Sequence, residues 1–165
     1  MGVKSSGSAD AGRNRKRLKL KFAIKDSLRE LRVQLSVLNH HVGAHLDLKD
    51  IDLDCLDLIS RDGPLSPSAL ARRTGLHPAT MTGILDRLEQ SGWIARDRDR
   101  SDRRAVVVRA NRGRAAEILR LYSGMNTSMD RICARYGEPE LELLADFLRR
   151  TADAGRNATD ELAAD

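Results

Sequence analysis

Residues 65–109 decide the fold, and they read LSPSALARRTGLHPATMTGILDRLEQSGWIARDRDRSDRRAVVVR. Ser66 suits the N-cap of a first helix, and a proline follows it at the position where helices tolerate one. Gly75 supplies a turn, and Pro78 begins a second helix. The apolar residues of the second helix recur at steps of three and four, which places on its inner face Met81, Ile84, Leu85 and Leu88. The stretch therefore predicts two short helices joined by a tight turn.

After these helices the pattern changes to that of a two-stranded hairpin, from residues 93–96 to residues 106–108. Its tip, residues 96–104, holds five arginines and three aspartates. A solvated loop alone accounts for this charge, but beside a helix-turn-helix the basic tip is better interpreted as a wing. An arginine at the tip of a wing can enter the minor groove of DNA, where the potential is most negative. Residues 65–109 therefore predict a winged helix-turn-helix that binds duplex DNA.

The outer face of the second helix is small and polar near its start. A threonine there offers a hydroxyl and a methyl group, and both can contact base edges in the major groove. Gly83 costs the helix about 1 kcal/mol relative to alanine, and a close approach of its backbone to DNA is one reason to keep it. The predicted DNA-binding residues are Ser66, Ser68, His77, Ala79, Thr80, Thr82, Gly83, Arg87, Arg100, Asp102, Arg103 and Arg104.

Helical patterns flank this stretch on both sides. Residues 1–14 are mainly Gly, Ser, Ala and Asp, which predicts a disordered tail. Residues 15–46 predict one long dimerisation helix. Its apolar stripe consists of Leu28, Leu31, Leu35, Leu38 and Val42. At about 1.5 Å per residue the helix would exceed about 40 Å, which is more than a small domain covers by itself, so we expect the stripe to pack against a second subunit.

Residues 47–110 are predicted to form the DNA-binding domain, which begins with a further helix. Asp50 and Asp52 suit the start of that helix, where the helix dipole favours anions. Its predicted buried face is Leu53, Leu56 and Ile59. A stop signal follows at residues 61–64, just before the helix-turn-helix.

Residues 111–165 are predicted to form C-terminal dimerisation helices. Asn111 suits the N-cap of a helix that would run to about Tyr136, with an apolar seam at steps of three and four. Gly137-Glu138-Pro139 interrupts the pattern, and leucines line a last helix. The predicted fold class is therefore mainly α, with a small β-hairpin wing between dimerisation helices.

The composition of the 165 residues excludes several classes of protein. The net charge of +5 favours a polyanionic partner such as nucleic acid. Hydrophobic residues make up 41% but aromatic residues only 3%, so the core must be aliphatic. No run of about 18 apolar residues predicts a membrane span, and no segment resembles a secretory signal. Cys55 and Cys133 are the only cysteines, which is typical of reduced thiols in a cytoplasmic protein.

Catalytic and metal chemistry fit the sequence less well. No Ser-His-Asp order, glycine-rich phosphate loop or CxxC motif is present, so we expect neither an enzyme nor a cofactor. His41 and His45 have the helical spacing of two metal ligands, but no local motif supplies a third. We therefore expect no metal site, and a metal-responsive regulator that uses these histidines stays open as an alternative. The residues predicted to bind a small ligand instead are His41, His45, Cys55 and Arg96.

A winged-helix module that serves only protein–protein contact is the rival interpretation from a different class. Such modules tend to lose the basic wing and the small polar reading face, and this sequence keeps both. The two interpretations differ in the salt dependence of duplex binding, which is steep only for a protein that neutralises phosphates.

Several motifs in this order resemble those of the MarR-type regulators of bacteria, named for multiple antibiotic resistance. They are Leu46-Asp47-Leu48, Leu56-Asp57-Leu58-Ile59, Thr74-Gly75-Leu76, Asp86-Arg87-Leu88-Glu89, Gly92-Trp93-Ile94 and Asp99-Arg100-Ser101-Asp102-Arg103-Arg104. The wing motif after Asp-Arg-Leu-Glu is fairly specific, and the resemblance covers about residues 28–160. The sequence departs from the family's usual Gly, Pro and Leu-Thr at Asp47, Arg100 and Ala110-Asn111.

The resemblance implies an obligate homodimer whose terminal helices interlock and whose two winged modules read a pseudo-palindromic operator. It implies Arg104 as the minor-groove arginine and Asp102 as the residue that steadies the wing. It also implies Thr80 and Thr82 at the reading end of the recognition helix. Many relatives bind a small aromatic or phenolic anion, so an effector of this class is implied. We expect repression, because occupying a promoter is physically simpler than recruiting a polymerase.

Overall fold

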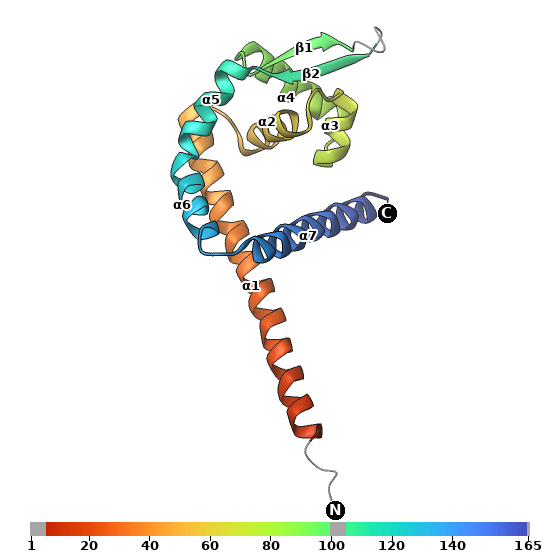
Figure 1. Ribbon diagram of the computed structural model, residues 1–165. Coiled ribbons are helices and arrows are strands. Elements are labelled where there is room, and N and C mark those ends of the chain that lie inside the picture. The colour runs from red at the N-terminus through yellow and green to blue at the C-terminus, as the bar shows by residue number, and fades with distance from the viewer. Residues whose placement is uncertain (1–5, 100–104, 165) are drawn as a thin grey trace, which may run out of the picture. The chain divides into compact units, whose positions relative to one another are not determined.

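The structure is a computed structural model that describes residues 6–99 and 105–164 (Figure 1). Its elements, in chain order, are α1 (Ser6–Leu46), α2 (Asp50–Asp62), α3 (Pro67–Thr74), α4 (Pro78–Gln90), β1 (Ile94–Arg98), β2 (Val106–Ala110), α5 (Arg112–Leu121), α6 (Ser123–Cys133) and α7 (Glu138–Ala164). The two strands form one antiparallel hairpin. A mainly helical fold with a small hairpin wing is therefore confirmed.

Helix α1 is uninterrupted over 41 residues. It ends at Leu46, as predicted, but it begins at Ser6 rather than at residue 15, so part of the predicted tail is helical. No proline occurs before residue 64, and nothing in the backbone chemistry forces the helix to begin later. Leu31 and Leu35 of the predicted stripe are 42% and 37% exposed, so a second subunit remains a prediction. None of the described helices is long and apolar enough to cross a membrane.

Asp47 joins two compact units of the chain, residues 1–47 and residues 48–165. Its φ is 54°, and it is the one non-glycine residue with a positive φ in the described part of the chain. Aspartate visits this left-handed region more readily than most residues do, because its short polar side chain can bond locally. The chain therefore turns at a position that glycine would occupy with less strain.

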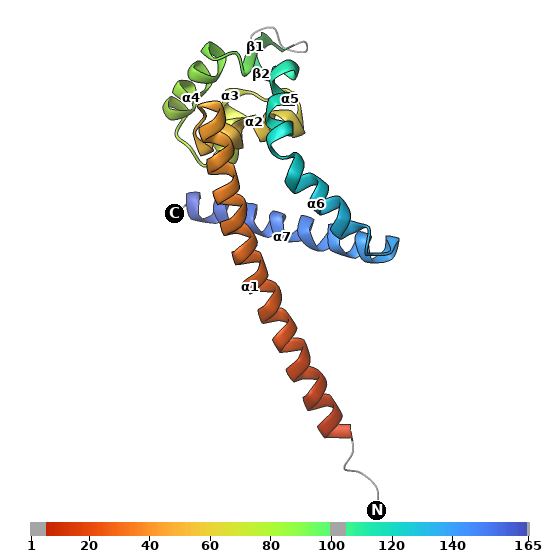
Figure 2. The same cartoon turned by 90° about the vertical axis from the view of Figure 1, so that its left-hand side faces the viewer.

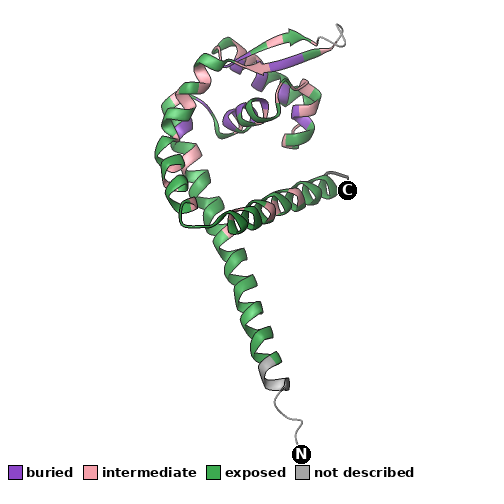
Figure 3. Cartoon of the chain, in the orientation of Figure 1, coloured by how far each residue is buried: buried purple, intermediate pink, exposed green. Residues whose placement is uncertain are grey.

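The core of the second unit lies among α2, α3, α4 and the hairpin, where Figure 3 shows most of the buried residues in purple. The predicted inner faces of α2 and α4 are confirmed as buried, namely Leu53, Leu56, Ile59, Met81, Ile84, Leu85 and Leu88. Leu70 of α3 and Val108 of β2 complete this set with no exposed surface. Trp93 is the one aromatic residue in the core of the described chain, which is otherwise aliphatic as expected.

The helix-turn-helix forms from local signals. Oγ of Ser66 accepts a hydrogen bond from the backbone N–H of Ala69 at 3.2 Å, which confirms the N-cap of α3. Gly75 follows α3 with a φ of 68°, in the left-handed region that glycine enters without strain. Nδ1 of His77 accepts a hydrogen bond from the N–H of Ala79 at 3.2 Å and caps α4. The turn between the two helices is thus fixed at both of its ends.

The hairpin is joined to the helix-turn-helix at its base. Ile94 lies opposite Ala110, and the pairing continues along both strands. Leu65, just before α3, forms an isolated bridge to Val108, with N–H···O distances of 3.2 and 2.8 Å. The base of the wing is therefore part of the same core as α2, α3 and α4.

The C-terminal region differs from the prediction of one helix up to residue 136. The structure has two helices there, α5 and α6, which bend at Tyr122 (Figure 2). Oγ of Ser123 donates to the carbonyl of Arg120 at 2.7 Å, and Gly124 follows. A serine that binds a backbone carbonyl and a glycine both weaken a continuous helix, which accounts for the break. The N-cap at Asn111 is confirmed, because its Oδ1 accepts the N–H of the second residue beyond it at 3.1 Å.

Candidate nucleic-acid interface

The start of α4 presents short side chains to solvent. Ala79, Thr80 and Gly83 are exposed, and their spacing of three and four residues places them on one face of the helix. Thr82 is also exposed, but its Oγ1 donates to the carbonyl of Pro78 at 3.0 Å, so its hydroxyl hydrogen is used within its own helix. Thr80 is therefore better suited than Thr82 to donate a hydrogen bond to a base.

Packing within the described chain does not require a glycine at position 83. A Cβ added to Gly83 would meet nothing within 4 Å, and its φ is not positive. Alanine would fit there and would favour the helix by about 1 kcal/mol. The contacts within the described chain thus do not explain the glycine. This agrees with the expectation that DNA approaches the backbone at Gly83.

The side chain of Arg87 turns from the outer face of α4 toward α2. Its Nη2 donates to Oδ1 of Asp52 at 2.5 Å, and its Nε donates to Oδ2 at 3.3 Å. Asp52 is 1% exposed and is the buried charged residue of the described core, whereas the side chain of Arg87 is 40% exposed. Sequence analysis placed Arg87 on the outer face as a DNA-binding residue and did not foresee this partner.

Arg96 connects β1 to α4, although the sequence suggested it as a ligand-binding residue. Its Nη2 lies 2.6 Å from Oδ1 of Asp86, and its Nη1 lies 2.9 Å from Oε2 of Glu89. The backbone N–H of Arg96 also donates to Oε1 of Glu89 at 3.3 Å. Two carboxylates of α4 therefore bind the guanidinium and fix the first strand of the wing against that helix.

Between the base and the tip, an ion pair joins the two strands of the wing. Nε of Arg109 on β2 lies 2.9 Å from Oδ2 of Asp97 on β1. The predicted tip residues Arg100, Asp102, Arg103 and Arg104 lie outside the described residues. The first strand side of the wing is therefore described up to Asp99, directly before the predicted DNA contacts.

The two serines predicted to contact DNA differ in their surroundings. Ser66 is half-buried, and its Oγ accepts the capping hydrogen bond of α3. Ser68 is exposed, with its Oγ 3.1 Å from that of Ser66. Ser68 is therefore the more accessible of the two to a DNA phosphate.

The root of the wing is held by residues at the start of α5. The guanidinium carbon of Arg114 lies 3.9 Å from the centre of the Trp93 ring, a cation–π geometry. Nη1 of Arg114 donates to the carbonyl of Ser91 at 2.6 Å. Nδ2 of Asn111 donates to the carbonyl of Gly92 at 3.1 Å. The end of α4, the root of the wing and the start of α5 therefore meet at one joint, which sequence analysis did not find.

The other residues predicted to bind a small ligand have contacts of their own. Cys55 has no exposed surface, and burial, followed by the nearby carboxylates of Asp52 and Asp54, raises the pKa of its thiol to about 11. His41 and His45 are exposed, and Nδ1 of His45 lies 2.9 Å from the carbonyl oxygen of His41 in the same helix. The described residues contain no group of three or more His, Cys, Asp or Glu side chains that could hold a metal ion.

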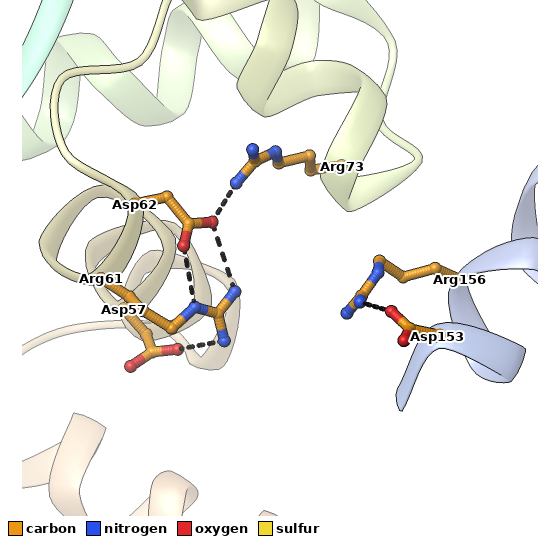
Figure 4. A network of polar contacts seen from close by, with 6 residues as sticks. All are labelled: Asp57, Arg61, Asp62, Arg73, Asp153 and Arg156. Carbon is orange, nitrogen blue, oxygen red and sulfur yellow. Dashed lines mark hydrogen bonds and ion pairs between the residues drawn. The ribbon is translucent and has the colours of Figure 1, made fainter. Parts of the chain in front are cut away.

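A pocket of about 360 Å³ lies between α2 and α3, where sequence analysis did not place one. Its lining residues are Ile51, Asp54, Asp57, Leu58, Arg73 and Thr74. Burial and then the neighbouring carboxylates raise the pKa of Asp54. Asp62 accepts hydrogen bonds from both Arg61 and Arg73 (Figure 4). Charged lining residues of both signs are therefore paired, Arg73 with Asp62 and Asp57 with Nη1 of Arg61 at 3.8 Å.

A helix-turn-helix whose hairpin packs on the same core defines a winged helix-turn-helix protein. In such proteins the second helix of the pair is the recognition helix, and here that helix is α4. Its exposed start, its ion pairs to α2 and β1, and the basic sequence of the wing are the features of a DNA-binding regulator.

Comparison with known proteins agrees with this class. The MarR family model matches residues 51–106. The chain is 35% identical over 119 residues to "Uncharacterized HTH-type transcriptional regulator YcgE" of Bacillus subtilis (strain 168). This alignment covers 72% of this chain and 77% of that protein. The chain is 26% identical over 89 residues to "HTH-type transcriptional repressor YetL" of the same strain, covering 54% of this chain and 53% of that protein.

A solved structure supports the same assignment. The crystal structure of MarR superposes with a TM-score of 0.59 at 26% identity, covering 83% of this chain and 93% of that one. The chain therefore belongs to the MarR family of transcriptional regulators, whose members are not enzymes.

Proposed function

We propose that the chain is a sequence-specific DNA-binding repressor that acts in the cytoplasm as a homodimer on a pseudo-palindromic operator. The observation that carries this proposal is the start of α4, a capped helix end with short exposed side chains at Ala79, Thr80 and Gly83. The first residues of a recognition helix contact base edges when the helix lies in the major groove. His77 and Ser68, which are exposed at helix starts, would bind phosphates and set the register on the duplex.

The wing supplies the second contact in this proposal. Arg96 binds two carboxylates of α4, so the direction of β1 depends on the position of the recognition helix. Arg104 would enter the minor groove, and Asp102 would hold its direction, with Arg100 and Arg103 near the phosphates. The sequence motif of the wing, rather than a described contact, supports these four assignments.

A homodimer is proposed because one copy leaves apolar side chains uncovered. On α7 the exposed ones include Leu143, Leu144, Phe147 and Leu148, and on α1 they include Leu31, Val33 and Leu35. Several large apolar side chains exposed on one helix are typical of protein interfaces. A dimer would carry two reading heads, which suits half-sites about one helical turn apart.

Release by a small aromatic or phenolic anion rests on the family resemblance alone. The pocket between α2 and α3 does not favour such a ligand, because Asp54 and Asp57 line it and would repel an anion. The sign of regulation draws support from the relative YetL, which is named a repressor.

Selection of bound duplexes from a random pool tests the proposal. We expect an inverted repeat with half-site centres about 10 base pairs apart, and a steep loss of affinity with rising salt. Thr80→Ala should relax the base preference at one position of each half-site, and Arg104→Ala should weaken binding. Equal affinity of the wild type for the selected and the random duplex at moderate salt would favour the protein-contact module instead.

A further inference from the structure

The carboxylate of Asp52 stands alone as a charged group in the described core, at 1% exposure. A buried ion pair is weak evidence for stability, because apolar residues of similar volume often serve the fold as well or better. The ion pair by itself therefore gives little reason for an aspartate at this position of α2, although the carboxylate also caps the first turn of the helix by accepting the N–H of Lys49. A geometric role for the pair accounts for the charge more directly.

A hydrogen bond within its own helix orients the carboxylate of Asp52, in addition to the contact with Arg87. Its Oδ2 accepts the backbone N–H of Lys49 at 2.9 Å in the first turn of α2, where the helix dipole also favours an anion. The same carboxylate takes the two hydrogen bonds from Nη2 and Nε of Arg87. An anchored carboxylate of this kind sets the orientation of a planar guanidinium, because a two-point contact leaves it little freedom to rotate.

Arg87 lies on the side of α4 that carries the reading residues. It follows Thr80 by seven residues, which is two helical turns, so both residues project from nearly the same side of the helix. Nε and Nη2 bind Asp52, and Nη1 takes no part in that contact. The guanidinium is bound to the core along one edge, and 40% of the Arg87 side chain as a whole is exposed to solvent.

We propose that Asp52 is a positioning residue for DNA binding, which holds Arg87 so that Nη1 meets a phosphate next to the bases that Thr80 faces. Arg87 would touch the DNA, and Asp52 would act through Arg87 without touching it. This inference rests on the proposed function and adds a contact in line with the reading face of α4.

The test measures affinity for the selected duplex and for a random duplex of equal length across a range of salt concentrations. The variants are Asp52→Asn, Arg87→Gln and the double variant, at a temperature where circular dichroism shows each to be folded. Arg87→Gln should weaken binding to both duplexes by the same factor, and the salt slope should fall by about one per reading head. The exposed pair Asp57 and Arg61 on α2 provides the matched control, because Asp57→Asn and Arg61→Gln should leave both quantities unchanged.

Asp52→Asn should weaken binding roughly tenfold, the size of effect expected when one ordered charge-assisted contact is lost. In the Arg87→Gln background the same substitution should change affinity by less than about twofold, because Asp52 then has nothing to position. Equal losses in both backgrounds would overturn the proposal. So would a lowered Tm with unchanged affinity and slope, which is the outcome of a purely structural role.

Arg87→Lys keeps the test decisive if Asp52→Asn does not fold. Lysine retains the positive charge beside Asp52 but lacks the second edge of the guanidinium fork, so its salt slope should match that of Arg87→Gln. A wild-type slope in Arg87→Lys would overturn the proposal. If the wild type binds the selected and the random duplex equally, the proposed function is overturned. If the wild type prefers the selected duplex but the Asp52 variants bind DNA as the wild type does, only this inference is overturned.

Discussion

The guanidinium of Arg96 on β1 lies 2.6 Å from the carboxylate of Asp86 on α4. Together with the bond from Arg96 to Glu89, this contact makes the wing and the recognition helix one body. Two DNA contacts of different kinds, one in each groove, would therefore keep a constant separation as the regulator binds.

Arg96→Gln should separate the wing from α4. The half-buried guanidinium makes charge-assisted bonds that water partly replaces, so the free energy of unfolding should fall by about 1 kcal/mol. Affinity for the selected duplex should fall as well, because the wing no longer has a fixed direction. Urea unfolding followed by circular dichroism measures the first effect, and fluorescence anisotropy of a labelled duplex measures the second.

Arg98→Gln, on the same strand, is the control for this loss of charge, because the side chain of Arg98 is exposed. Its stability should stay within about 0.5 kcal/mol of the wild type. Equal stability of the Arg96 and Arg98 variants would show that the bonds to Asp86 and Glu89 do not hold the wing.

Gly83→Ala should stabilise the fold and impair DNA binding at once. The added methyl group meets no atom within 4 Å, so the helix should gain about 1 kcal/mol and the Tm should rise by about 2–4 °C. Duplex affinity should fall roughly tenfold if the backbone approaches the DNA at this point. Thermal unfolding and duplex titration measure the two effects separately.

Gly155→Ala in α7 matches this change, because a Cβ at Gly155 also meets nothing within 4 Å. It should stabilise the fold to a similar degree, and at a protein concentration where size-exclusion chromatography shows the same oligomeric state as the wild type, its DNA affinity should not change. Full affinity in Gly83→Ala would remove the argument for a close approach.

Cys55 should resist thiol reagents and make the fold sensitive to alkali. Its buried thiol has a pKa of about 11, whereas an exposed thiol in the unfolded chain ionises near pH 8.5. Between these values the unfolded chain loses the proton first, so it binds fewer protons than the native state and stability falls as pH rises. Unfolding free energies measured from pH 7 to pH 11 should decline more steeply than those of Cys55→Val.

The same property predicts slow labelling. At pH 8 and without denaturant, a disulfide reagent should modify Cys133, which is half-buried, much faster than Cys55. Rapid modification of both thiols would mean that the core around α2 opens readily.

Asp47→Val should destabilise the junction between the two compact units. A β-branched residue is poorly suited to a φ of 54° and costs about 1–2 kcal/mol there. Asp47→Gly, which suits that backbone, should leave stability within about 1 kcal/mol of the wild type. Chemical unfolding of the two variants side by side measures the difference, and equal stabilities would place the backbone at position 47 in an ordinary conformation.

Local chemistry predicted most of the helix-turn-helix. The caps at Ser66 and Asn111 and the inner face of α4 follow from signals within a few residues of each other, and the structure confirms them. The break at Tyr122 depends on how one serine hydroxyl competes for a carbonyl, which a seam of apolar residues does not reveal.

The ion pairs were beyond this kind of prediction. Asp52 and Arg87 are 35 residues apart, and which carboxylate meets which guanidinium depends on how α2 and α4 pack. One signal was available, because Asp52 precedes Leu56 and Ile59 by four and seven residues and so shares their buried face. A charged residue on an apolar helical face indicates an oppositely charged partner on another element, and Arg87 of α4 is that partner.

The chain contains a single tryptophan, Trp93, and it lies at the joint beneath Arg114 rather than on the reading surface. Tryptophan emission, excited at wavelengths that Tyr122 and Tyr136 do not absorb, therefore comes from one site, a buried ring among aliphatic residues with a cation over its face. Entry of water to the indole, or movement of Arg114 away from the ring, changes that emission. Stopped-flow fluorescence during operator binding would thus time the motion of the joint with no label attached, separately from anisotropy, which times the arrival of the DNA.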